Sequence, residues 1–128
     1  METYTVVRPE HLNHYGHLFG GCLLKWVDEI AWIAASRDNP GCRFVTVGMD
    51  RVEFHQGAHS GMVLRFEAVE SCRGRTSLTY SVRVFADDLE TGVEESIFST
   101  CITFVRLDES GRKLPLPSGS GSQVCRED

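Results

Sequence analysis

An aspartate lies in the middle of an otherwise apolar stretch of the sequence. Asp28 falls within CLLKWVDEIAWIAA, residues 22–35, where the only other charged side chains are Lys25 and Glu29. Burying a lone carboxylate is costly unless it is paired with a cation or opens onto a cavity. Lys25 lies three residues before Asp28, a favourable pairing distance on a helix. The spacing therefore leaves two interpretations open, a surface ion pair and a catalytic general base.

Two glycines precede this stretch, at the point where a helix would begin. Backbone N–H groups at a helix start have no partner within the helix, and Gly20 and Gly21 leave theirs unshielded. Such donors, at the positive end of the helix dipole, suit an oxyanion formed at an acyl carbonyl. Asp28 would lie about 12 Å further along the axis. If both groups are catalytic, we expect them to come from different subunits with antiparallel helices.

The hydrophobic pattern predicts an α+β domain. The apolar segment from Gly20 ends at a strong helix stop, Arg37-Asp38-Asn39-Pro40-Gly41, and is apolar on nearly every face, as a buried helix would be. Period-two alternation predicts strands around the helix, joined by short turns typical of an antiparallel sheet. We expect this sheet to wrap one long central helix. The predicted strands are 3–7, 44–54, 62–69, 76–85 and 96–105.

Composition restricts the class of protein. The 128 residues fit one domain, and the formal net charge of -5 gives no global positive field that would collect nucleic acid or an anionic membrane. No apolar run is long enough to span a membrane, so we expect a cytoplasmic protein. The cysteines number five and show no CxxC spacing. We interpret them as free thiols and expect no structural zinc.

A longer segment carries a family resemblance. The run VVRPEHLNHYGHLFGGCLLKWVDEIAWIAA resembles the signature of hotdog-fold acyl-CoA hydrolases, the cytosolic brain-type and bacterial hexameric group, with N-x-x-G-x-x-F-G-G before a helix aspartate. The segments DRVEFHQ, GRTSLTYSVRVFADDLETG and FVRLDESGRKLPLP are similar to that family as well. The resemblance implies one hotdog domain over residues 1–117. Residues 118–128, which contain SGSGS, are expected to form a flexible tail.

The resemblance implies hydrolysis of fatty acyl-CoA to free acid and CoA, without a metal or other cofactor. It also implies a homohexamer, built as a trimer of hotdog dimers. By position, Asn13 and Asp28 match the family's catalytic pair, which meets across the dimer interface. Gly20 and Gly21 match its oxyanion donors. Asp28 would either deprotonate water or attack the carbonyl itself, and the sequence does not choose between these routes.

The CoA phosphates need local cations in an acidic protein. The turn Arg73-Gly74-Arg75-Thr76-Ser77 offers guanidinium and hydroxyl groups, although a solvated hairpin would carry the same residues. Its similarity to the family's G-R-[ST]-S turn implies CoA contact at Arg75, Thr76 and Ser77. Arg73 and Arg112 are weaker candidates.

A metal site is an alternative use of the first loop. His11, His14 and His17 repeat every third residue, and neutral imidazoles are good ligands for zinc or nickel. They lie in an irregular, glycine-bearing segment without a nearby cysteine. The family motif explains this loop without a metal, so we expect none.

Two other functions fit the same scaffold. A non-catalytic acyl-CoA-binding hotdog protein would not need the carboxylate of Asp28, and an acyl-thioester hydratase would show a D-x-N-x-x-H pattern that Asp28 does not provide. The chain also departs from the family at Gly57, where a proline is usual, and at Met62, where an aspartate is usual. These departures leave the loop between the second and third strands without an assigned role.

Overall fold

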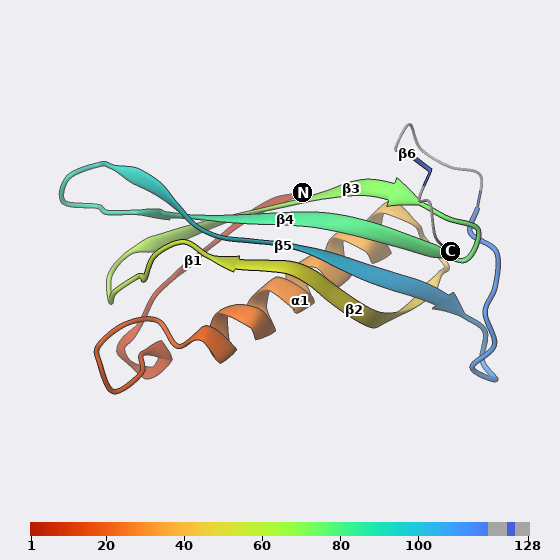
Figure 1. Cartoon of the computed structure of the whole chain (residues 1–128), viewed down its shortest axis with the longest axis horizontal. Helices are drawn as coiled ribbons and strands as arrows, with labels where there is room; N and C mark the ends of the chain where they lie inside the picture. The colour runs from red at the N-terminus through yellow and green to blue at the C-terminus, as the bar shows by residue number, and fades with distance from the viewer. Residues whose placement is uncertain (118–122, 125–128) are drawn as a thin grey trace.

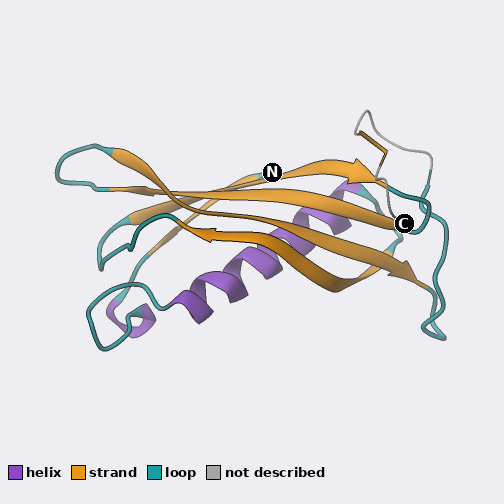
Figure 2. Cartoon of the chain, viewed as in Figure 1, coloured by secondary structure: helices purple, strands orange, loops and turns teal. Residues whose placement is uncertain are grey.

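The chain folds as a curved antiparallel sheet with one long helix across one face (Figures 1 and 2). This computed structural model describes residues 1–117 and 123–124. The arrangement confirms the expected α+β hotdog architecture, and each predicted segment forms its element. The elements are β1 (Glu2–Val6), the short 3-10 helix η1 (Pro9–His11), α1 (Gly20–Asp38), β2 (Arg43–Phe54), β3 (Val63–Arg73), β4 (Ser77–Asp87), β5 (Glu94–Leu107) and β6 (Gln123–Val124).

The strand order places β2 at one edge of the sheet. The order is β1-β3-β4-β5-β2, and all four of these pairings are antiparallel. Two hairpins join β3 to β4 and β4 to β5, whereas α1 carries the chain from β1 at one edge to β2 at the other. The backbone groups on the outer side of β2 therefore lack a strand neighbour among the described residues.

One face of α1 forms the core with the sheet. Its buried residues recur at helical spacing, and three of them are alanines, which let the helix approach the strands closely. The aromatic rings of Phe66, Tyr80, Phe98 and Phe104 fill the space on the sheet side. The buried helix residues are Leu23, Val27, Ala31, Ala34 and Ala35.

The expectation of an entirely buried helix is wrong for the single chain. Trp32 is 44% exposed, and Trp26 and Ile30 are only partly buried. Apolar residues on every face of a helix predict that the helix is buried, but they do not show whether its own chain or another chain covers each face. Here the sheet of the same chain covers only one face of α1. The Trp32 indole donates to the Phe44 carbonyl at 3.1 Å, so this open helix face adjoins β2.

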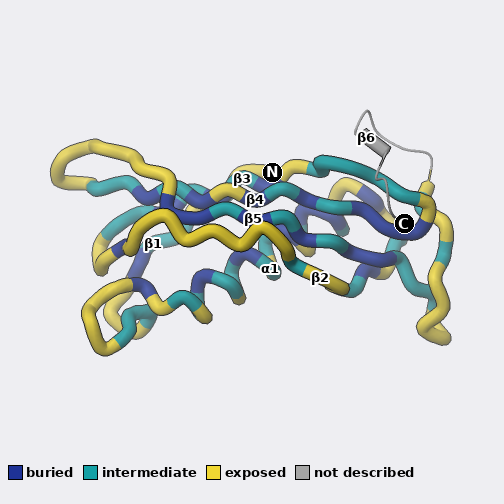
Figure 3. Tube along the Cα trace, viewed as in Figure 1, coloured by how far each residue is buried: buried dark blue, intermediate teal, exposed yellow. Residues whose placement is uncertain are grey.

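The edge strand β2 is also apolar and open. Val47, Val52 and Phe54 are 58%, 41% and 55% exposed, and Figure 3 shows most of this strand as exposed. A bulge interrupts its pairing with β5 between Asp50 and Glu53, where Arg51 has a φ of 51°. Bulges of this kind are common on edge strands.

A polar cluster ties the end of α1 to the hairpin between β3 and β4. The buried Asn39 side chain donates to the Ala35 carbonyl at 2.9 Å and accepts from Arg73 at 2.8 Å. Arg73 also pairs with Glu70 at 2.7 Å. Tyr80 donates to Asp38, and burial together with this bond raises the pKa of the phenol. The cluster fixes the position of the turn that follows Arg73.

The C-terminal tail and the cysteines agree only in part with the expectations from the sequence. The expected flexible tail lies largely outside the described residues, but Gln123 and Val124 pair in parallel with β3. Cys22, Cys42 and Cys101 are free thiols, as expected. Cys72 is disulfide-bonded, so the expectation of a free thiol is wrong there, because the spacing of the cysteines gave no signal of pairing. In the described part of the chain, no helix is long and apolar enough to cross a membrane.

Replacing Asn39 with alanine should destabilise the fold. The change leaves the Ala35 carbonyl without its side-chain donor and removes one acceptor from Arg73, which should cost about 1–3 kcal/mol of unfolding free energy. Urea unfolding at fixed protein concentration measures this loss. Ser110→Ala, at an exposed turn position, should shift the free energy by less than about 0.5 kcal/mol. Equal effects of the two substitutions would contradict the assigned role of Asn39.

Candidate active site

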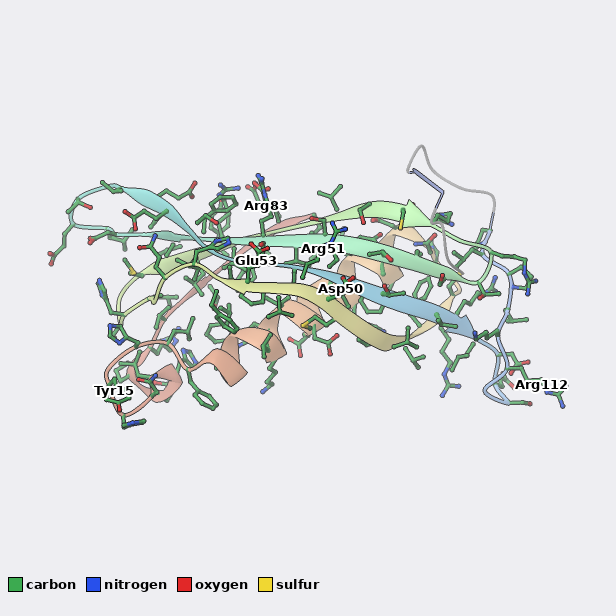
Figure 4. All side chains as sticks on the ribbon, viewed as in Figure 1. Tyr15, Asp50, Arg51, Glu53, Arg83 and Arg112 are labelled. Atoms are coloured by element: carbon green, nitrogen blue, oxygen red, sulfur yellow. The ribbon has the colours of Figure 1, made fainter. Side chains whose placement is uncertain are left out.

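The expected site residues lie at separate places along α1. The helix has 19 residues, which corresponds to about 27 Å from end to end. Asn13 and Gly20 lie at its N-terminal end, and the turn with Arg75 lies at the opposite end of the molecule. Figure 4 marks the two ends with Tyr15 and Arg112. One chain therefore does not bring all of these residues together.

A cavity of about 380 Å³ opens at the N-terminal end of α1. Asn13 and Gly20 line it together with Phe54, at the end of β2, and Ile97 on β5. Its remaining lining is a mixture of polar and apolar groups, so it can hold both a polar reacting group and an alkyl chain. The remaining residues that line it are His17, Leu18, Leu23, His55, Gln56, Gly57 and Ala58.

The loop before α1 fixes the orientation of the Asn13 amide. Its Oδ1 accepts backbone N–H groups from Tyr15 at 2.9 Å and from His17 at 3.2 Å. Both donors must face the oxygen, so the Nδ2 group is the one left to act outside the loop. Asn13 can therefore donate a hydrogen bond to a ligand but is not free to accept one through its amide oxygen.

The start of α1 offers backbone donors. Phe19 precedes the helix without a side-chain cap, and the first α-type bond runs from the Leu23 amide to the Phe19 carbonyl at 3.1 Å. The amides of Gly20 and Gly21 consequently lack helical partners. A Cβ at Gly21 would lie 2.7 Å from the Phe19 ring, whereas at Gly20 it would make only ordinary contact with Phe54. A side chain at position 21 would require the exposed Phe19 ring to move, whereas packing within the chain gives no reason for the glycine at position 20.

Asp28 lies two turns further along and faces β2. Its Oδ1 accepts a hydrogen bond from the Thr46 hydroxyl at 2.8 Å. Among the described residues, neither Lys25 nor any other cation forms an ion pair with it. The ion-pair interpretation from the sequence is therefore not supported. The carboxylate is held through one oxygen by a neutral donor, and the other oxygen can act on a ligand.

Sequence reasoning missed Thr46 and His55. Thr46 lies 18 residues from Asp28, and a polar residue within the alternation of a strand gave no sign of that contact. His55 lines the cavity, where its ring contacts the Ser96 hydroxyl at 3.0 Å and the Glu53 carboxylate at 3.4 Å. The contact of Thr46 with Asp28 depends on the packing of α1 beside β2, and the contact of His55 with Ser96 depends on the chain path next to β5, neither of which local sequence reveals.

The three histidines of the first loop do not converge. The Nδ1 atom of His11 accepts the Arg8 amide at 3.0 Å, and its ring packs edge-on against Trp26. His14 lies against Tyr15, whereas His17 lines the cavity. Within residues 1–117 and 123–124, no group of three or more histidine, cysteine or carboxylate side chains could hold a metal ion.

The predicted CoA turn is only partly exposed. Arg75 is exposed, but Thr76 and Ser77 are 3% and 6% exposed. Arg73 is engaged by Glu70, by Asn39 and by the Pro117 carbonyl. Of the four residues, Arg75 is therefore the one whose side chain a ligand can reach from solvent in a single chain.

Comparisons with known proteins identify the family of this chain. A family model described as the thioesterase superfamily matches residues 15–93. An uncharacterized acyl-CoA thioester hydrolase of Bacillus subtilis is 34% identical over 113 residues, covering 87% of this chain and 64% of the relative. The chain thus spans slightly less than two thirds of that relative's length, and a fifth or less of two mouse thioesterases.

Solved structures match over most of the chain. A hexameric acyl-CoA thioesterase has a TM-score of 0.86 at 35% identity, covering 91% of this chain and 74% of the other. An acyl-CoA hydrolase from Staphylococcus aureus, solved with butyryl-CoA and CoA, has a TM-score of 0.84 at 30% identity, covering 92% and 71%. Its solved variants replace with alanine an asparagine, an aspartate fifteen residues later and a threonine seventeen residues after that. The family model and the structural matches together show that this chain belongs to the thioesterase superfamily.

Proposed function

We propose that this chain hydrolyses acyl-CoA thioesters to free acid and CoA, at sites shared between two copies of the chain. The observation that carries the proposal is the placement of Asp28. Its carboxylate has no cationic partner among the described residues, and it lies about 12 Å along the helix from the Gly20 amide. One carbonyl cannot reach both groups within one chain, so a second copy must supply one of them.

The open surfaces of α1 and β2 support this assembly. Trp32, Val47, Val52 and Phe54 leave apolar area exposed along the helix and the adjoining edge strand, and such a surface marks an interaction site. Two copies related by a twofold axis would cover it, with their helices antiparallel. If the helices cross between Gly20 and Asp28, each glycine lies opposite the partner's aspartate, which gives two equivalent sites.

The S. aureus variants support the choice of residues. Asn13 and Asp28 are fifteen residues apart, the interval between the asparagine and aspartate replaced in that protein. Thr46 follows Asp28 by eighteen residues, one more than the corresponding interval there. The hydrogen bond from Thr46 to Asp28 gives this third residue a physical role here, because it holds the carboxylate toward its target.

The chemistry follows from these positions. The free oxygen of Asp28 removes a proton from water, which attacks the thioester carbonyl. The amides of Gly20 and Gly21 stabilise the oxyanion, and the Nδ2 group of Asn13 donates to the water or to the carbonyl. Collapse of the oxyanion then breaks the carbon–sulfur bond, and the leaving thiolate takes up the proton held by Asp28, which releases CoA as the thiol and restores the carboxylate. Direct attack by Asp28 remains the alternative route.

The CoA nucleotide would bind away from the reacting carbonyl. Asp28 and the end of α1 at Asp38 are about 15 Å apart along the helix, and the turn with Arg75 lies at that end. The pantetheine arm of CoA separates its thioester from its phosphates, so a distant clamp is what the substrate requires. Arg75 is exposed and can bind phosphate there, whereas the burial of Thr76 and Ser77 restricts them to positioning the turn or contacting CoA after a local change.

Two further points concern the larger assembly and the location of the protein in the cell. We propose a homohexamer arranged as a trimer of dimers, supported by the hexameric acyl-CoA thioesterases that the chain resembles. No cofactor is proposed. A cytoplasmic location stays a prediction from the sequence.

The direct test is release of CoA thiol from acetyl-, butyryl-, octanoyl- and lauroyl-CoA. Asp28→Asn keeps the size of the side chain and removes its charge, so we expect kcat to fall about 10²- to 10⁴-fold. Size-exclusion chromatography checks that parent and variant assemble alike. An assembled parent that binds these compounds but releases no thiol would instead be a binding module. Equal rates in both proteins would keep the hydrolase and reject Asp28.

Thr46→Val should lower kcat less than Asp28→Asn does. It removes the hydroxyl that holds Oδ1 of Asp28, and a hydrogen bond to a charged group is worth about 1.5–3 kcal/mol. We therefore expect a loss of roughly tenfold to a hundredfold. Thr46→Ser retains the hydroxyl and should keep most of the activity. Identical losses in the valine and serine variants would rule out the hydrogen bond as the cause.

Arg75→Ala should raise KM while kcat stays within about twofold, because the lost contact is the same in the ground state and the transition state. Steady-state kinetics at two salt concentrations measure both constants. The control is Arg83→Ala, an exposed arginine on β4 that lies six residues beyond the turn and was never a candidate for CoA contact. A fall in kcat with KM unchanged would argue against phosphate binding by Arg75.

A further inference from the structure

A second cavity lies beside the candidate active site. It measures about 240 Å³ and shares Gln56, Gly57 and Ile97 with the first one, so the two are neighbouring chambers. Met62, Ala86, Val93 and Ile97 give the second chamber an apolar lining. Its polar groups come mainly from the hairpin between β4 and β5. We call these the first chamber, at Asn13 and Gly20, and the second chamber, at Met62 and Ala86.

A bulge places Ile97 at the junction. In the pairing of β4 with β5, Phe85 lies opposite Ser96 and Val84 opposite Phe98, so Ile97 has no partner residue. Two consecutive side chains, Ile97 and Phe98, are consequently buried on the same side, at 2% and 0% exposure. Bulges re-aim side chains in this way next to binding sites.

The surrounding backbone holds this junction in place. The His55 amide donates to the Ile97 carbonyl at 2.8 Å, and the Leu18 amide donates to the Ala58 carbonyl at 2.7 Å. Gly57 passes close to His17, since a Cβ there would lie 3.3 Å from its ring. The start of the loop, at Gln56 and Gly57, therefore lies between the two chambers together with Ile97, whereas Met62 lines the second chamber only.

We propose that the acyl chain of the substrate runs from the first chamber past Ile97 into the second, so that the second chamber sets the preferred chain length. This inference rests on the proposed function. A thioester held at Gly20 occupies the first chamber, and acetyl or butyryl groups end there. Medium-length chains reach the apolar lining of the second chamber, where each further buried methylene should raise kcat/KM about fourfold.

Ala86 provides the test position. It is 2% exposed, and its small side chain leaves the second chamber open. Ala86→Leu fills that space, so the ratio of kcat/KM for decanoyl-CoA to that for butyryl-CoA should fall tenfold or more. Ala68→Leu is the matched control, because Ala68 is 1% exposed on the neighbouring strand β3 and lines neither chamber. It should leave the ratio unchanged.

A second variant controls for the case in which Ala86→Leu fails to fold. Met62→Phe enlarges a partly buried side chain in the second chamber and should lower the same ratio. An unchanged ratio in both Ala86→Leu and Met62→Phe, with butyryl-CoA turnover retained, would overturn the inference while the hydrolase stands. If the parent releases no thiol, calorimetric affinities for decanoyl-CoA and butyryl-CoA replace kcat/KM. A chain-length preference in binding that Ala86→Leu removes would support the second chamber, and its absence would reject it.

Discussion

The rigid separation of two groups along one helix constrains everything else in this structure. Gly20 and Asp28 are fixed about 12 Å apart by the rise of α1, and no rotation of a side chain closes that gap. A carbonyl that needs both a backbone donor and a carboxylate must therefore lie between two helices. In the proposed reaction the site is shared by a pair of chains, and each chain contributes Gly20 to one site and Asp28 to the other.

The fold prepares the chain for that pairing. Because α1 connects one edge of the sheet to the other, β2 becomes an edge strand directly beside the open face of the helix. The same strand supplies Thr46, which holds Asp28, and Phe54, which lines the cavity at Gly20. In the proposed dimer, this edge strand would form part of the interface and part of both half-sites. When two chains form the proposed dimer, the same step completes the active site.

Local pattern predicted the elements because each one buries a face at its own period. The helix from Gly20 and the alternating strands followed from spacing alone, and the family motif named Asn13 and Asp28. The missing information is long-range. The exposure of Trp32 in the single chain could not be predicted, because an apolar residue in the sequence does not show whether the core of its own chain or a second subunit covers it. The contact of Thr46 with Asp28 depends on how α1 packs beside β2, whereas the surroundings of His55 and the bulge at Ile97 depend on how the chain runs along β5 and on the register of the strands. The family motif also did not predict that Thr76 and Ser77 are buried in the single chain, and their contact with CoA stays a prediction.

The measurement that tests the shared site most directly is complementation between two inactive variants. Asn13→Ala and Asp28→Ala chains are co-expressed and allowed to assemble at random. Half of the dimers are then mixed, and one of the two sites in each mixed dimer contains both intact residues, so about a quarter of the parent activity should return. Each variant alone should stay inactive. A random mixture that assembles normally but remains as inactive as either variant would show that Asn13 and Asp28 do not act together across the interface, and would contradict the account.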